Sequence, residues 1–75
     1  MDPIKTGAVI RSQRQMKGMT QLELAEKLCV SDKTVSKWEC GGGAPDISLL
    51  PALARALDVD VKALLYGGLQ ERGSS

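Results

Sequence analysis

The polar stretch from Ser31 to Lys37 carries side chains that suit recognition of a nucleic acid. Read as a helix, the stretch directs Val35 and Trp38 to one side, because residues three apart share a helical face. The remaining surface is short, polar and rich in hydrogen-bond donors, as a helix needs for contacts with base edges and phosphates in a major groove. That surface consists of Asp32, Lys33, Thr34, Ser36 and Lys37.

The composition argues against catalysis and against a metal site. The chain of 75 residues has no histidine, no GxxxxGK phosphate loop and no motif that pairs either cysteine with a base. Two thiols without a histidine do not complete a four-ligand zinc site. Cys29 and Cys40 would lie at least roughly 13 Å apart along a helix that rises about 1.5 Å per residue, beyond disulfide reach. We expect two free thiols, no enzymatic activity and no cofactor.

Two helices must position the polar surface, and the first begins at a capping box. Thr20 and Glu23 have the spacing at which each side chain accepts a backbone N–H at a helix start. Leu22, Ala25 and Leu28 follow at helical spacing and predict one apolar face. The pattern predicts an amphipathic helix from Gln21 to Leu28.

The second helix begins after a short break. The apolar pattern stops at Cys29 and Val30, and Ser31 supplies a new N-cap while Asp32 places a negative charge in the first turn. Two helices separated by such a break have the dimensions of a helix-turn-helix that reads DNA. Double-stranded DNA is therefore the first partner to test.

Five helices are expected in all, with no strand and no internal repeat. The first ends at Gly18, which suits the left-handed conformation after a helix. We place the fourth cap at Ser48, because Pro51 then lies in the first turn, whereas a cap at Asp46 would make Pro51 distort that turn. The expected ranges are about 5–16, 21–28, 32–40, about 48–57 and 61–65, with residues 1–66 forming the domain and 67–75 a flexible tail.

Length and hydropathy favour one small soluble domain. Seventy-five residues are close to the lower limit for a single core without disulfides or metals. No apolar run approaches the roughly 20 residues that cross a bilayer, and the N-terminus lacks a signal-peptide pattern. We expect no membrane partner and a cytoplasmic location.

The net charge of +1 is small, but its distribution favours the first half of the chain. Residues 1–40 hold seven basic and five acidic side chains, and residues 41–75 hold three basic and four acidic ones. We therefore expect weak, strongly salt-dependent binding to DNA of arbitrary sequence.

These motifs resemble the Cro/C1-type helix-turn-helix family, also called the XRE family, over about residues 7–65. The resemblance rests on Gly18, Met19, Thr20, Gln21, Leu24, Ala25, Val30, Ser31, Thr34, Val35, Ser36, Lys37, Trp38, Glu39 and Gly41. Upstream it includes Gly7, Ile10, Arg11 and Arg14, and downstream Pro45, Asp46, Ile47, Leu49, Leu50, Leu53, Ala54, Leu57, Val59 and Leu64. It implies an all-α, compact five-helix bundle of the lambda-repressor-like DNA-binding type, with the helix-turn-helix at the second and third helices.

The resemblance also implies roles for single residues. In the family, the residue matching Gln21 holds the DNA backbone, and those matching Lys33, Thr34 and Lys37 contact bases and backbone. Each could instead be an ordinary solvent-facing side chain. Asp32 could accept from cytosine N4, but stabilising the helix start is its favoured role. The candidate DNA-binding set is Gln21, Ser31, Asp32, Lys33, Thr34, Ser36 and Lys37, in which Ser36 has either a phosphate or solvent as its partner.

Three further residues are assigned structural roles. In relatives, residues matching Arg14 and Glu39 pair between the first helix and the end of the third. Trp38 shares the inward face with Val35 and is expected to fill the core. The other expected core residues are Leu24, Leu28, Leu50, Leu53, Ala54 and Leu57.

The chain departs from the family pattern at three places. Cys29 occupies a turn position where glycine or asparagine is frequent, so a left-handed backbone there would be strained by roughly 1 kcal/mol. Cys40 replaces a common basic or amide residue. The GGGAP loop of residues 41–45 lacks the basic side chains of some relatives and offers only backbone N–H groups to phosphate.

The expected function is sequence-specific binding of double-stranded DNA by a transcriptional regulator, a repressor of bacterial or phage type. Members of the family commonly bind inverted-repeat operators as homodimers. The available dimer surface would comprise Leu64, Leu65, Tyr66 and Leu69, although Leu65 or Tyr66 could equally close the core. The alternative is a helical protein-interaction module, such as an antitoxin or a scaffold, that reads no base sequence.

Overall fold

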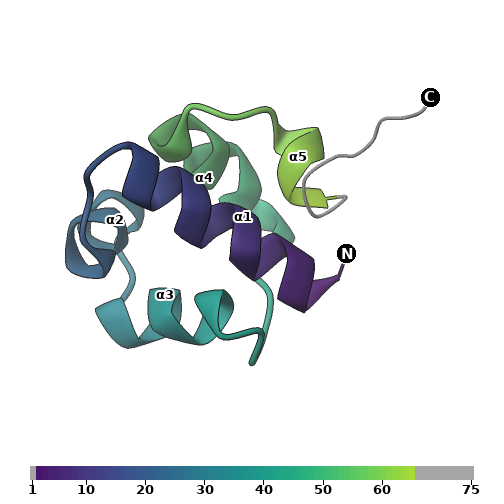
Figure 1. The fold of residues 1–75 in the computed structure, drawn as a ribbon, viewed down its shortest axis with the longest axis horizontal. Helices are drawn as coiled ribbons and strands as arrows, with labels where there is room; N and C mark the ends of the chain where they lie inside the picture. Colours follow the sequence, from purple (N-terminus) through teal and green to yellow (C-terminus); the bar gives the residue numbers. More distant parts are fainter. Residues whose placement is uncertain (1, 66–75) are drawn as a thin grey trace.

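The computed structural model describes residues 2–65, which form five α-helices, one short 3-10 helix and no strand. The elements are α1 (Pro3–Met16), α2 (Gln21–Leu28), α3 (Asp32–Glu39), η1 (Ile47–Leu49), α4 (Leu50–Leu57) and α5 (Val61–Leu65). In Figure 1, α1 crosses the middle of the molecule, with α3 on one side and α4 and α5 on the other. The expected all-α fold is confirmed. Tyr66, Leu69 and the expected tail at 67–75 lie outside the described residues.

α1 begins at Pro3, two residues before the expected start. The Asp2 carboxylate accepts the backbone N–H groups of Ile4 at 3.0 Å and Lys5 at 3.3 Å. Pro3 has no N–H and needs no partner in the first turn. At the other end, Gly18 is left-handed with φ of 69°, as expected for the residue that ends this helix.

α2 has the predicted bounds and the predicted capping box. Thr20 Oγ1 accepts Glu23 N–H at 3.1 Å, and Glu23 Oε1 accepts Thr20 N–H at 2.8 Å. The expectation for Leu22 was wrong, because its side chain is 54% exposed. The buried face instead runs through Leu24, Ala25 and Leu28 toward α3 and α4. Leu22 lies about 200° around the helix from Leu24, so it faces solvent.

α3 ends at Glu39, one residue earlier than predicted, and Cys40 is its C-cap. The predicted cap of α4 at Ser48 was also wrong, because η1 precedes the helix and α4 starts at Leu50. The Ser48 hydroxyl bonds to the Asp46 carboxylate instead of capping α4. A start at Leu50 places Pro51 in the first turn, where its missing N–H removes no helical hydrogen bond. α5 has the predicted bounds.

The core lies around α1 and contains every expected core residue. Its members are Ile10, Leu24, Ala25, Leu28, Val35, Trp38, Leu50, Leu53, Ala54, Leu57 and Leu64. The buried Thr6 hydroxyl donates to the Leu64 carbonyl at 2.7 Å and so ties α5 to α1. Among residues 2–65, no helix is long and apolar enough to cross a membrane.

A close approach of α1 to α3 sets the position of the polar helix. A methyl group at Gly7 would lie 2.0 Å from the Trp38 carbonyl oxygen, far inside van der Waals contact. Trp38 itself is 5% exposed and packs into the core. Glycine at position 7 therefore lets the backbone of α3 lie directly against α1.

Candidate nucleic-acid interface

α3 divides into a buried face and a polar surface. Val35 is fully buried, whereas Asp32, Lys33 and Lys37 are exposed and Thr34 and Ser36 are half-buried. This is the division that the sequence pattern predicts. The structure gathers all of the α3 candidates on the outer surface of one helix, which leaves Val35 and Trp38 to hold that helix on the core.

The first turn of α3 is closed by its own hydroxyl groups. Ser31 Oγ accepts Thr34 N–H at 3.2 Å and lies 2.9 Å from Thr34 Oγ1. Ser31 is therefore the N-cap, and the Thr34 hydroxyl is already bonded within the protein. Whichever of the two oxygens donates this bond, the O–H group of the other hydroxyl remains for an acceptor outside the protein, because each hydroxyl carries one donor.

Lys33 and Lys37 are exposed and lie one helical turn apart. The ion pairs within residues 2–65 are Arg14–Glu39 and Lys17–Asp58, so neither α3 lysine has a carboxylate within 4.0 Å in this part of the chain. Asp32, at the positive end of the helix dipole, is the acidic residue of the first turn. The two ammonium groups are thus available to anionic ligands.

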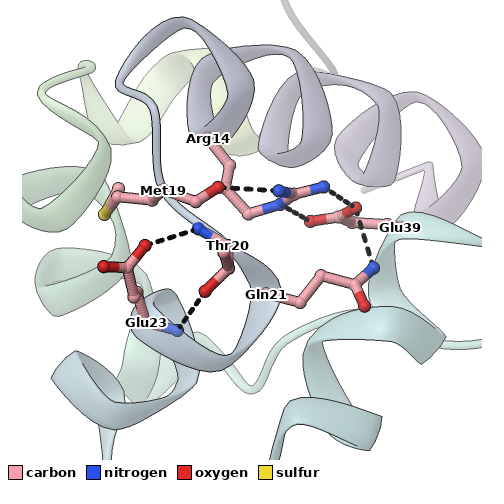
Figure 2. Close-up of polar contacts among 6 residues, drawn as sticks. All are labelled: Arg14, Met19, Thr20, Gln21, Glu23 and Glu39. Carbon is pink, nitrogen blue, oxygen red and sulfur yellow. Dashed lines mark hydrogen bonds and ion pairs between the residues drawn. The ribbon is translucent and has the colours of Figure 1, made fainter.

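Gln21 belongs to a polar network at the junction of α1, α2 and α3, which Figure 2 shows. Its Nε2 donates to Glu39 Oε1 at 3.2 Å. Arg14 donates to the same carboxylate through Nε at 2.7 Å and Nη2 at 3.0 Å, and through Nη1 to the Met19 carbonyl at 2.8 Å. The network brings the first residue of α2 to the last residue of α3.

The chemistry of this network fixes the orientation of the Gln21 amide. A carboxylate has only acceptors, so the amide must turn its NH₂ group toward Glu39, and one N–H of that group remains for another partner.

The hydrogen bond with Glu39 raises the pKa of Arg14 above its ordinary value, although burial opposes this change. Arg14 therefore stays charged and balances the Glu39 carboxylate. The resemblance to the family paired Arg14 with Glu39, whereas Gln21 was assigned only to the DNA backbone and its hydrogen bond to Glu39, 18 residues away, was not expected.

Both cysteines lie at the C-terminal ends of helices. Cys29 is the left-handed C-cap of α2 and Cys40 the C-cap of α3, and both are exposed and free, as predicted. Within residues 2–65, no group of three or more His, Cys, Asp or Glu side chains is arranged to hold a metal ion.

The chain is similar to one protein family and to several domains of known structure. The helix-turn-helix family model matches residues 10–64. The HTH-type transcriptional activator BcrR of Enterococcus faecalis is 38% identical over 58 residues, covering 77% of this chain and 28% of that protein. An endothelial differentiation-related factor 1 homolog of Danio rerio is 32% identical over 60 residues, covering 80% and 41%. The chain thus spans less than half the length of these two relatives.

A solved structure extends the similarity to three dimensions. The P22 c2 repressor, crystallised with a synthetic operator, matches with a TM-score of 0.78 and 32% sequence identity. The match covers 83% of this chain and 94% of that one. The lambda-repressor-like fold inferred from the motifs is therefore confirmed.

Proposed function

The chain belongs to the Cro/C1-type helix-turn-helix family, and on that premise we propose that it is the DNA-binding part of a transcriptional regulator. In this proposal α3 lies in the major groove of double-stranded DNA and reads a specific base sequence. The proposal places the protein in the compartment that holds the DNA, the cytoplasm of a bacterial host.

One observation carries the proposal: α3 presents exposed lysines that have no carboxylate partner within residues 2–65, while its apolar face is buried against α1. Residues at the start of a recognition helix are the ones that reach base edges. Asp32 and Lys33 occupy that start. A lysine there donates to guanine O6 or N7, and an aspartate accepts from cytosine N4.

The polar groups around α3 supply the contacts that position the helix on the duplex. We assign Gln21 to a phosphate, through the amide N–H that Glu39 leaves free. Ser31 is exposed and Thr34 and Ser36 are half-buried, and we assign their hydroxyl groups to the sugar–phosphate backbone. These contacts are independent of base sequence and set the register of the helix.

We further propose that the protein binds an inverted repeat as a homodimer, with one α3 in each half-site. The matched proteins include one that is named an activator and one that is named a repressor, so repression stays a prediction. They also include a vertebrate protein, so the bacterial or phage source stays a prediction too.

Selection of binding sites from a randomised duplex library at about physiological salt tests the proposal. We expect an enriched inverted repeat that binds roughly a thousandfold or more tightly than random duplex. Lys33→Ala should weaken this preference by relaxing it at particular base pairs. Lys62→Ala, which removes a lysine from α5 on the other side of α1, should leave it unchanged. Weak binding without enrichment would favour the alternative, a protein-interaction module.

A further inference from the structure

The two lysines of α3 differ in what lies beside their side chains. A methyl group at Gly42 would lie 3.2 Å from Lys37 Cγ, and one at Gly43 would lie 3.3 Å from Lys37 Cε. The Lys37 stem therefore lies along the backbone of Gly42 and Gly43, in space that other residues would occupy with their own side chains. The Gly42 N–H also donates to the Lys37 carbonyl at 2.9 Å, which holds the loop against the end of α3.

We propose that Lys37 is a phosphate-binding residue that works with the Gly42–Gly43 backbone, and that it does not read a base. This inference rests on the proposed function and assigns a backbone phosphate of the DNA to Lys37. The loop of residues 41–45 has no charged side chain of its own. Lys37 supplies the positive charge that this loop lacks.

The place of Lys37 along the helix supports this assignment. It lies five residues after Asp32, or about 7.5 Å along α3 at about 1.5 Å per residue. Base contacts come mainly from the N-terminal residues of a recognition helix. The Cε and Cδ atoms of Lys37 lie 3.3 and 3.9 Å from a Cβ built at Gly43, so the stem lies beside the loop that follows the end of α3.

The chemistry of the side chain agrees with a phosphate partner. A lysine ammonium is a compact point charge that binds phosphate without a fixed geometry, whereas base reading gains from two directed bonds. Packing of the stem on the glycine backbone also restricts its rotamers before DNA arrives, which lowers the entropy lost on binding. Lys33 has no such contact with the loop glycines and remains the candidate base reader.

The matched pair Lys33→Ala and Lys37→Ala tests the inference, with Lys62→Ala as the control for loss of one lysine elsewhere. Affinity is measured for the selected duplex and for every single-base variant of it, at several salt concentrations. We expect Lys37→Ala to weaken all duplexes by the same factor and to lower the salt slope by about 0.9 per monomer. Lys33→Ala should relax the preference at particular base pairs.

The glycines provide an independent test of the positioning. Neither Gly42 nor Gly43 has the left-handed backbone of Gly41, so alanine is compatible with the backbone at both positions. Gly43→Ala should displace the Lys37 stem and lower affinity without changing base preference. The same change should have little further effect when Lys37 is already alanine.

Each outcome separates this inference from the proposed function. A change in base preference at one position on Lys37→Ala would overturn the inference and leave the proposed function intact. Wild-type protein that binds without preference, together with a salt slope lowered by Lys37→Ala, would support the phosphate role and overturn sequence-specific reading. No binding to any duplex would overturn both.

Discussion

Arg14 on α1 donates two parallel hydrogen bonds to Glu39 at the end of α3, from Nε to Oε2 at 2.7 Å and from Nη2 to Oε1 at 3.0 Å. The Glu39 side chain is only 3% exposed and the Arg14 side chain 11%. Because Arg14 also donates to the Met19 carbonyl and Glu39 accepts from Gln21, the pair holds three helices in register. It thereby positions the polar surface of α3 without belonging to it.

Removal of Arg14 should destabilise the fold strongly. Arg14→Ala leaves the buried Glu39 carboxylate without its charge partner, a loss of about 3 to 5 kcal/mol in the free energy of unfolding. Lys17→Ala is the control, because its partner Asp58 is 81% exposed and such surface pairs contribute about 0 to 1 kcal/mol. Urea unfolding of both variants measures the difference. Equal losses, or no coupling in a double-mutant cycle with Glu39→Ala, would contradict the pairing.

Addition of a methyl group at Gly7 should also be costly. An alanine Cβ would lie 2.0 Å from the Trp38 carbonyl oxygen and 3.2 Å from Glu39 Cα, so α1 and α3 must separate. We expect a loss of at least about 2 kcal/mol, within the range for overpacked cores or above it. Gly18→Ala is a useful comparison, since within residues 2–65 an added Cβ would meet no atom within 4 Å beyond its chain neighbours, and only the left-handed backbone is strained. A melting temperature of Gly7→Ala equal to that of the wild-type protein would refute the close contact.

Local contacts could be predicted from the sequence of this chain, whereas long-range contacts could not. Thr20, Glu23 and Ser31 act within three residues, so their caps and the bounds of α2 could be predicted from spacing alone. Asp2 is also a local cap, and its position directly before Pro3 is a signal that sequence reasoning overlooked.

Long-range contacts could not be predicted in this way. Leu22 was misplaced because helical spacing defines an apolar stripe but not the angle at which α3 and α4 pack on it. The bond from Gln21 to Glu39 and the seating of Lys37 on the glycine loop depend on how whole helices meet. Side-chain roles at the candidate interface therefore needed the three-dimensional arrangement.

Replacement of Cys29 by glycine should stabilise the protein. Cys29 has φ of 59° and ψ of 38°, a left-handed conformation that costs a residue with a Cβ roughly 1 kcal/mol. Asp58 has nearly the same φ of 58° at the end of α4, but aspartate tolerates this conformation better, so Asp58→Gly should gain less. Melting temperatures measure both effects. A clearly lower melting temperature for Cys29→Gly would contradict the strain.

Loss of the Thr6 hydroxyl should loosen α5. Thr6→Val keeps the shape of the side chain but leaves the Leu64 carbonyl without its donor at a fully buried site. An unpaired buried acceptor costs about 1 to 3 kcal/mol, whereas Thr6→Ser keeps the donor and should lose less. Amide hydrogen exchange in α5 reports the effect directly. Identical exchange in both variants would show that the hydrogen bond does not anchor the helix.

The most direct test of the central claim, that α3 carries the DNA-reading surface, is amide chemical-shift mapping during titration with the selected duplex. We predict the largest changes at Gln21, at residues 31–37 and at Gly42 and Gly43. Changes confined to α4 and α5, with the amides of α3 unmoved, would contradict the claim.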